Sequence, residues 1–291
     1  MSLPARFLRD PSVERLIESA LREDLGTGDV TTRRTVPAAA RAKARLWSRE
    51  AGLAAGLPIF ARVFRRLDRR VGVKIRMAEG GRFRRGQLLA ELQGPARAIL
   101  SGERVALNLL QRLCGIATLT AAYVAEARRG SRSVKLLDTR KTTPGLRLLE
   151  KYAVACGGGV NHRLRLDDAI LIKDNHLKVA GSVAEAVRRA RGGGLAVEVE
   201  VETLAELDQA LAAGADTVLL DNFPLERLRA AQARVGAFNR GCKRKVFTEA
   251  SGGVTLATLR AVAAAGVDSI SVGALTHSVR ALDLSLEFLP Q

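Results

Sequence analysis

Residues 196–221 read AVEVEVETLAELDQALAAGADTVLLD, and this stretch decides the fold. In 196–202 valines alternate with glutamates, which is the period of two expected of a strand. Residues 204–214 carry apolar side chains at helical spacing, and 217–221 form a second short apolar run. A strand, a helix and a strand in this order predict two parallel strands joined by a crossover helix.

The same rhythm continues on both sides of this stretch. Further short apolar runs occur, and helical segments such as AGSVAEAVRRAR and TLATLRAVAAAG separate most of them. No Gly-x-Gly-x-x-Gly turn follows the first run, so the pattern favours an α/β barrel over a dinucleotide-binding open sheet. The six predicted strands span residues 134–138, 169–173, 196–202, 217–221, 245–249 and 269–273.

The first half of the chain has a different organisation. Residues 12–24 predict a helix with Ser12 as its N-cap. From about 30 to 95, short apolar runs alternate with glycine-rich turns, which indicates a small sheet domain with one or two helices. Residues 97–128 predict a long helical region with a break near Cys114-Gly115.

The composition is that of a globular protein with a strong positive charge. The 291 residues are 47% apolar and only 4% aromatic, and 47 Lys and Arg outweigh 30 Asp and Glu for a net charge of +17. This balance favours anionic partners, either nucleic acid, an acidic surface, or metabolites that carry phosphate and carboxylate groups. No helix-turn-helix pattern or aromatic stacking platform is present, so we expect no nucleic-acid partner.

Cysteine usage and hydropathy bear on the compartment. The three cysteines, Cys114, Cys156 and Cys242, include no Cys-x-x-Cys pair, which argues against a disulfide framework or a zinc site and fits a reducing cytoplasm. The N-terminal MSLPARFLRDPSVERLI has no apolar stretch long enough for a signal peptide, and we expect no membrane span.

Polar residues follow the predicted strands of the second half. In parallel barrels the C-terminal strand ends form the rim of the active site. Arg140 and Lys141 follow the first strand and, with His162 and Arg163, flank a glycine run at 157–159. Arginine binds carboxylates as a fork and lysine binds phosphate as a point charge, so these residues, together with Lys173, suit a substrate that carries both groups.

An acidic group complements these cations. Glu198, Glu200 and Glu202 alternate along one strand and therefore share a face. Glu200 and Asp221, on neighbouring strands, are candidates to hold Mg²⁺ and ribose hydroxyls. The alternative is that one of these glutamates pairs with a lysine of the barrel.

Two glycine-containing turns predict phosphate binding. Ser251-Gly252-Gly253 and Gly273-Ala274 each precede a helix, whose N-terminal backbone N–H groups bind phosphate well. Loops after the last two strands are the usual phosphate position in barrels. The three histidines, His162, His176 and His277, lack metal-ligand spacing, so we propose no zinc site from them.

Several long motifs occur in order along the chain. They are EDLGTGDVTT, ERVALNLLQRLCGIAT, LDTRKTTPGLRLLEKYAVACGGGVNHR, LDDAILIKDNH, VEVEVETLAEL, VLLDNF, EASGGV and VGALTHS. Together they resemble the quinolinate phosphoribosyltransferases, the carboxylating nicotinate-nucleotide pyrophosphorylases of NAD biosynthesis. The resemblance covers almost the whole chain. Cys114 departs from it, because serine is expected there.

The resemblance implies a type II phosphoribosyltransferase-like architecture. An N-terminal α/β sandwich (1–116) precedes an incomplete parallel α/β barrel (117–275), and the tail (276–291) returns to the first domain. It also implies a homodimer, or a hexamer built as a trimer of dimers, in which Arg104 reaches the partner's site. The implied reaction joins quinolinate to phosphoribosyl pyrophosphate (PRPP) and gives nicotinate mononucleotide, pyrophosphate and CO₂.

The resemblance also assigns roles to residues of this chain. The quinolinate carboxylates are expected to bind Arg104, Arg140, His162, Arg163 and Lys173. PRPP and its phosphates are expected to contact Lys141, Glu200, Asp221, Ser251, Gly252, Gly273 and His277. Catalysis is assigned to Lys141, Lys173, Glu200 and Asp221, and Mg²⁺ accompanies PRPP at Glu200 and Asp221.

Two other enzyme readings stay open at this point. A paralogue associated with molybdenum transport shares much of the barrel sequence, although Arg104, Arg140, His162 and Arg163 argue for quinolinate. A Schiff-base aldolase is the other, because Lys173 ends a barrel strand and a lysine of depressed pKa forms Schiff bases. The Glu200–Asp221 pair and the two phosphate turns have no place in that mechanism.

Overall fold

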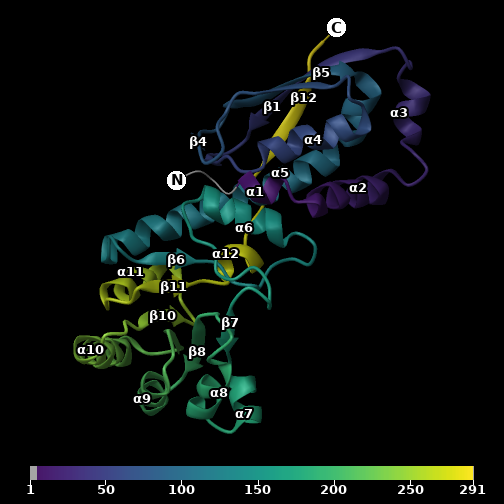
Figure 1. Ribbon diagram of the computed structural model, residues 1–291. Coiled ribbons are helices and arrows are strands. Elements are labelled where there is room, and N and C mark those ends of the chain that lie inside the picture. Colours follow the sequence, from purple (N-terminus) through teal and green to yellow (C-terminus); the bar gives the residue numbers. More distant parts are fainter. Residues whose placement is uncertain (1–4, 291) are drawn as a thin grey trace. The chain divides into compact units, whose positions relative to one another are not determined.

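The computed structural model describes residues 5–290, and the chain divides into two compact units. The first unit contains the chain up to residue 121, residues 142–158 and the chain from 274 onward. The second unit contains residues 122–141 and 159–273. Each unit is a separate layered structure and is described by itself (Figure 1).

The second unit is built on one sheet of six parallel strands. Their order is β6-β11-β10-β9-β8-β7, so the strands from β7 to β11 lie side by side in sequence order and the last strand, β11, lies beside the first, β6. That order is typical of a barrel. No ladder between described residues joins β7 back to β6, so the barrel is incomplete and the expected α/β class is confirmed. The strands are β6 (Lys135–Leu137), β7 (Ile170–Ile172), β8 (Val197–Val201), β9 (Thr217–Asp221), β10 (Phe247–Ser251) and β11 (Ser269–Ser271).

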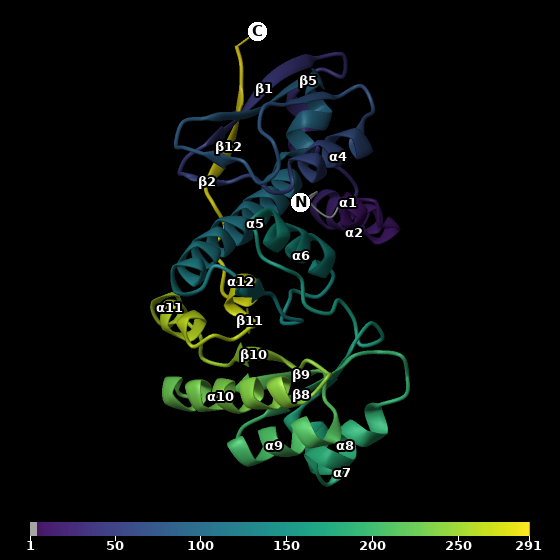
Figure 2. The same ribbon diagram turned by 60° about the vertical axis from the view of Figure 1, so that its left-hand side comes forward.

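Helices connect these strands, and local sequence explains where they begin. Helix α9 (Leu204–Ala213) starts at a capping box, in which Thr203 accepts the Glu206 N–H at 3.2 Å and Glu206 accepts the Thr203 N–H at 3.2 Å. Figures 1 and 2 show α9 and α10 on the outside of the sheet. The remaining helices between these strands are α7 (Asp174–Ala180), α8 (Val183–Ala190), α10 (Leu225–Gly241) and α11 (Leu256–Ala264).

The strand register separates the sheet into an apolar and a polar face. On β8, Val197, Val199 and Val201 are at most 1% exposed and belong to the core. Val199 pairs with Val218, whereas Glu200 pairs with Leu219. Because side chains alternate between the faces, the glutamates of β8 project to the side opposite the valines. The residues that share the polar side with them include Lys173, Asp221, Glu249, Ser251, Ser269 and Ser271.

The first unit contains an antiparallel sheet with the order β12-β1-β5-β3. Strand β12 comes from the C-terminal segment and pairs with β1, Leu286 opposite Leu46. A second, two-stranded sheet joins β2 to β4. The strands are β1 (Arg41–Ser48), β2 (Gly52–Leu53), β3 (Gly72–Ile75), β4 (Arg82–Phe83), β5 (Leu88–Pro95) and β12 (Leu284–Phe288).

Helix α2 (Pro11–Leu25) corrects one expectation. Its N-cap is Asp10, whose carboxylate accepts the Ser12 N–H at 2.8 Å, so Ser12 lies inside the helix. Proline at the first helical position has no N–H to lose, which favours a start at Pro11. The other helices of this unit are α1 (Ala5–Leu8), α3 (Val30–Thr35), α4 (Leu57–Leu67), α6 (Arg147–Cys156) and α12 (Ala274–His277).

Helix α5 (Ala96–Gly130) is continuous, so the predicted break near Cys114-Gly115 was wrong. The glycine serves close packing instead. A Cβ at Gly115 would lie 2.2 Å from the carbonyl oxygen of Arg280, so only glycine lets the C-terminal segment approach this closely.

Among the described residues α5 is the one helix long and apolar enough to cross a membrane, but 56% of its apolar window is buried, as in a core helix. The expected domain boundary at 116/117 lies inside this helix and stays a prediction. Residues 1–4 and 291, which belong to the predicted N-terminal domain and tail, lie outside the described residues.

A buried ion pair ties three segments of the first unit together. Glu150, on α6, is 0% exposed and accepts from Arg112, on α5, at 2.6 and 2.8 Å. The same guanidinium donates to the Thr143 hydroxyl at 2.8 Å and to the Thr276 carbonyl at 3.1 Å. Arg112 therefore connects α5, the loop before α6 and the short helix α12.

We predict that Arg112→Ala lowers the free energy of unfolding by about 3–5 kcal/mol, because it leaves the buried Glu150 carboxylate without its counter-charge. Arg129→Ala removes an exposed arginine paired with Glu126 and should cost less than about 1 kcal/mol. Equilibrium urea denaturation of both variants measures the difference. Equal losses would contradict the role given to the buried pair.

Candidate active site

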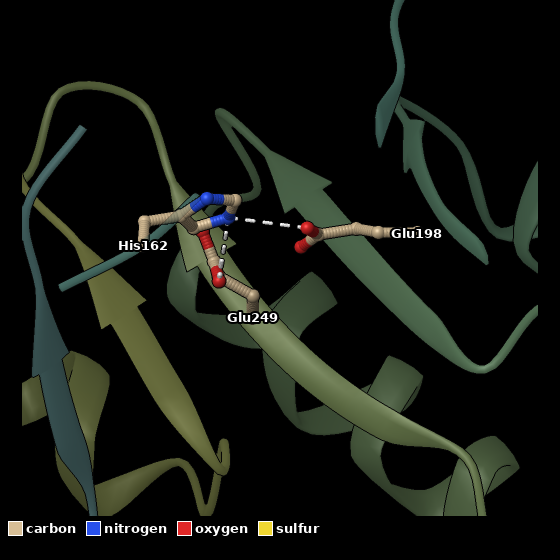
Figure 3. A group of neighbouring side chains, drawn as sticks. All are labelled: His162, Glu198 and Glu249. Carbon is tan, nitrogen blue, oxygen red and sulfur yellow. Dashed lines mark hydrogen bonds and ion pairs between the residues drawn. The ribbon is translucent and has the colours of Figure 1, made fainter. Parts of the chain in front are cut away.

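On the polar side of the six-stranded sheet, the side chains of one histidine and two glutamates contact one another (Figure 3). His162 Nε2 lies 3.1 Å from Glu198 Oε2 and 3.6 Å from Glu249 Oε2. The side chains of His162 and Glu198 are 13% exposed and that of Glu249 is 3% exposed. The three residues, called here the His–Glu–Glu cluster, come from the loop before β7, from β8 and from β10.

Asp138, at the end of β6, holds the loop that carries this histidine. Its carboxylate is fully buried and accepts the His162 N–H at 2.9 Å and the Asn161 side-chain amide at 2.6 Å. The backbone of this loop is also tied to β6, because the Val160 N–H donates to the Leu136 carbonyl at 2.8 Å. Residues 160–162 are therefore fixed to the end of the first strand.

Burial and repulsion set the protonation of Glu249. Burial and, after it, the neighbouring Glu198 carboxylate raise the pKa of the Glu249 carboxyl to about 7, against the smaller lowering effects of His162, Ser271 and Ser269. Glu249 therefore keeps its proton at pH values where an ordinary carboxyl has lost it. Two adjacent acids of which one is protonated avoid the cost of two buried charges.

Lys173 and Glu200 form the second feature of this face. Lys173 follows β7 and is the N-cap of α7, and its Nζ lies 3.1 Å from Glu200 Oε2. The glutamate side chain is 10% exposed, whereas that of the lysine is 46% exposed. The sequence-based alternative that a glutamate pairs with a barrel lysine is therefore realised in the structure. The ammonium group lies at the open end of the strands, next to a carboxylate.

The two arginines of the cationic group lie close enough to repel each other. Burial lowers the pKa of the Arg163 guanidinium, and the positive charge of Arg140 lowers it further. Arg163 donates to the Ala169 carbonyl at 3.1 Å, which fixes its side chain at the end of this loop. Two guanidinium groups held together in this way form a receptor for a ligand with more than one negative charge.

The turn after β10 fits tightly against the turn after β9. Gly252 has φ +84°, and a Cβ there would lie 2.3 Å from Asn222 Oδ1. Asn222 itself has φ 53°, donates its side-chain amide to Asp221 at 2.8 Å, and donates its N–H to the Ser251 carbonyl at 2.9 Å. Ser251 and Asp221 are paired across the two strands. A substrate bound near Asp221 would therefore meet this glycine turn as well.

The structure collects most, but not all, of the predicted residues in one unit. Lys141 is exposed directly after Arg140, and Gly273 is the last residue of the second unit. Glu202 lies past the end of β8 and is exposed, so it does not join Glu198 and Glu200. Arg104, on α5, and His277, on α12, are exposed residues of the first unit.

Two residues of the site were not among the predicted ones. Glu249 and Asp138 each end or follow a predicted strand, as the other predicted residues do. Their position at the end of a predicted strand therefore indicated a possible site residue. Sequence alone, however, does not distinguish a carboxylate of a site from a solvent-exposed carboxylate in a loop. Only the register shows that Glu249 faces Glu198 and that Asp138 faces inward.

Family models and known proteins agree over most of the chain. The models of the quinolinate phosphoribosyl transferase N-terminal and C-terminal domains match residues 29–114 and 116–287. A carboxylating nicotinate-nucleotide pyrophosphorylase of Mycobacterium leprae is 45% identical over 280 residues, which are 93% of this chain and 95% of that protein. The corresponding Homo sapiens protein is 41% identical over 286 residues, with 97% and 94% covered.

Solved structures match equally well. The nicotinate-nucleotide pyrophosphorylase from Francisella tularensis superimposes with a TM-score of 0.88 at 41% identity, over 96% of each chain. Two domain models, relatives above 40% identity and this structural likeness agree with the motifs and with the polar barrel face. The chain therefore belongs to the quinolinate phosphoribosyltransferase family.

Proposed function

We propose that this chain transfers the phosphoribosyl group of PRPP to quinolinate and decarboxylates the product in NAD biosynthesis. The pyridine nitrogen forms a bond to C1 of the ribose while the bond from C1 to the pyrophosphate oxygen breaks, and pyrophosphate leaves with the electron pair. The bond from C2 of the pyridine to its carboxylate then breaks. CO₂ departs, and C2 takes up a proton to give nicotinate mononucleotide.

The observation that carries this proposal is the pair of adjacent guanidinium groups on Arg140 and Arg163. Quinolinate carries two neighbouring carboxylates, which match two adjacent arginine forks in charge and shape. His162 precedes Arg163 and takes part in the same site, either through its ring or through the backbone of its neighbour. Arg104 is proposed to complete the site from the partner subunit of a homodimer, which also permits a hexamer built as a trimer of dimers.

Lys173 and Lys141 are proposed to lie between the two substrates and to contact the phosphates. Their positive charge opposes the charge that builds on the departing pyrophosphate. Lys173 is paired with Glu200 at 3.1 Å, a setting unlike the apolar pocket of a Schiff-base lysine. Its proposed role is therefore electrostatic, and the reaction needs no covalent intermediate with the enzyme.

Glu200 and Asp221 fit the magnesium ion that we propose accompanies PRPP. Glu200 pairs with Leu219, two residues before Asp221, so both carboxylates project to the same side of adjoining strands. Carboxylate oxygens are the protein ligands that Mg²⁺ prefers, and the ion keeps positions for water and substrate phosphates. When bound, Mg²⁺ neutralises phosphate charge. The two carboxylates also oppose the positive charge that develops at C1 and accept from the ribose hydroxyls.

The 5′-phosphate is proposed to lie on the turns after β10 and β11. Ser251 and Gly252 are candidates on one side and Gly273 on the other, with His277 supplied by α12. Gly252 and Gly253 have a left-handed backbone, and turns of this kind form concave sites of backbone N–H groups that bind anions. We expect the enzyme to act in the cytoplasm on small molecules, without nucleic-acid or membrane partners.

Pyrophosphate release tests this function directly. We expect the purified protein, supplied with quinolinate, PRPP and Mg²⁺, to release pyrophosphate and CO₂ in equal amounts and to form nicotinate mononucleotide. Nicotinate in place of quinolinate should give far less pyrophosphate, because one of the two carboxylates is missing. The absence of release with quinolinate would contradict the proposed function and favour the transport-associated paralogue.

Arg140→Ala and Lys173→Ala should each lower kcat/KM by roughly 30- to 1,000-fold, the equivalent of about 2–4 kcal/mol of transition-state stabilisation. Lys178→Ala is a matched control, because Lys178 is an exposed lysine on α7 that pairs only locally with Asp174 and Asn175. Circular dichroism checks that all three variants are folded. Wild-type rates in folded Arg140→Ala or Lys173→Ala would contradict the assigned site.

Gly252→Ala and Gly253→Ala form a second matched pair. Both residues have positive φ, so both variants carry the cost of a left-handed alanine, roughly 1–2 kcal/mol. Only Gly252→Ala also displaces Asn222 beside Asp221, since the nearest atom to a Cβ at Gly253 is 3.8 Å away. We expect Gly252→Ala to raise the KM for PRPP about tenfold more than Gly253→Ala, roughly 1.4 kcal/mol. Equal effects on the KM would exclude this contact as the basis of the phosphate site.

A further inference from the structure

The loop before β7 carries Arg163 at its first position. Residues 163–169 read RLRLDDA and lead from His162 to Ile170, the first residue of β7. Residues 165–168 are exposed, and Leu166 is 69% exposed. An apolar side chain that remains in water gains little from hydrophobic packing. The conformation of this loop therefore depends on its polar contacts.

Asp168 supplies two of these contacts. Its Oδ2 atom accepts the backbone N–H of Leu164 at 2.6 Å and that of Arg165 at 3.2 Å. A hydrogen bond from a backbone N–H to a carboxylate is charge-assisted and stronger than one between neutral groups. The end of the loop is therefore tied to the two residues that directly follow Arg163.

Arg163 closes the same loop with its own groups. Its backbone N–H donates to His162 Nδ1 at 2.7 Å, and its Nη1 donates to the Ala169 carbonyl at 3.1 Å. The guanidinium contact with Ala169 and the carboxylate contacts of Asp168 both join the start of the loop to its end. Each therefore favours the conformation that the other requires.

The charge of Asp168 contributes less than these hydrogen bonds. Burial and then the positive charge of Arg140 lower the pKa of the Arg163 guanidinium, and the negative charges of Glu198 and Asp168 oppose this shift. Asp168 is exposed, so solvent screens its charge. Its main effect on Arg163 is therefore through the backbone of the loop.

A guanidinium group that is ordered before the substrate arrives binds that substrate more tightly. An arginine side chain has many rotamers, and ordering it on binding, together with a flexible loop, costs conformational entropy. Arg163 also lies near Arg140, whose positive charge repels it. A fixed loop holds the two guanidinium groups together against this repulsion.

We propose that Asp168 is a positioning residue that holds Arg163 beside Arg140 for the substrate dicarboxylate. It acts by fixing the loop backbone at Leu164 and Arg165, without touching the substrate itself. The identity of the dicarboxylate, quinolinate, rests on the proposed function. Loss of this support should weaken the binding of quinolinate and leave the binding of PRPP unchanged.

Three variants separate the hydrogen bonds of Asp168 from its charge. Asp168→Ala removes both. Asp168→Asn removes the charge but keeps a side-chain oxygen that can accept both N–H groups. Asp167→Ala is the matched control, because it removes the neighbouring exposed carboxylate and leaves the hydrogen bonds of Asp168 in place.

Amide hydrogen–deuterium exchange of the free protein is measured first. We expect exchange over residues 163–169 to be faster in Asp168→Ala than in the wild type, because the loop opens more often. Asp168→Asn and Asp167→Ala should exchange as the wild type does. Unchanged exchange in Asp168→Ala, or equally fast exchange in Asp167→Ala, would overturn the inference.

The KM for quinolinate is measured next. Asp168→Ala should raise it about 5- to 20-fold, with changes of less than about twofold in kcat and in the KM for PRPP. Asp168→Asn should restore the KM for quinolinate to within about threefold of the wild type, and Asp167→Ala should leave it unchanged. A wild-type KM in Asp168→Ala, or an equal rise in Asp168→Asn, would overturn the inference.

A double-mutant cycle shows whether Asp168 acts through Arg163. In Arg163→Ala, which lacks the guanidinium group, the addition of Asp168→Ala should change kcat/KM for quinolinate by less than about twofold. An equal loss in both backgrounds would overturn the inference. Failure of the proposed function is distinguishable, because it abolishes pyrophosphate release in the wild type and leaves the exchange result unchanged.

Discussion

The alternation of side chains along parallel strands is the constraint on which the second unit depends. Strands covered by helices on one side place every second residue in that apolar layer, and β8 fills those positions with Val197, Val199 and Val201. The intervening residues must point to the inside of the sheet. There the sequence supplies glutamates, so a polar interior follows directly from the register that buries the valines.

A polar interior has to be neutralised locally, and this chain does so in two ways. Near the strand ends Glu200 is paired with Lys173, whose exposed ammonium group remains open to a substrate. Deeper in the sheet Arg163 interacts electrostatically with Glu198, and the pKa of Glu249, raised to about 7 by burial and by Glu198, favours its protonated form.

The first unit also contains a buried carboxylate, and there an arginine neutralises it in an ion pair. Glu150 is completely buried, and Arg112 satisfies it while also binding Thr143 and Thr276. Such a pair stabilises little over an apolar contact, but breaking it is costly, so it holds these segments in one arrangement. Some of the many arginines in this chain therefore have a structural role, whereas many others are exposed on the surface.

Sequence alone determined the periodicities and therefore the fold class. The valine–glutamate alternation, the six short strands and the polar strand ends are local patterns, and the long motifs identified the family. Local patterns failed where long-range packing decides. The sequence predicts a helix break at Gly115, but this glycine is a close-packing site for Arg280, and Asp10 rather than Ser12 caps α2.

Tertiary structure alone decided which polar residues meet. Asp138, His162, Glu198 and Glu249 come from separate parts of the chain, and no local signal states which carboxylate faces which. The His162 ring accepts the Arg163 N–H at Nδ1 and contacts Glu198 with Nε2. Such contacts depend on strand register and burial, which arise from the packing of the whole sheet and not from any one segment.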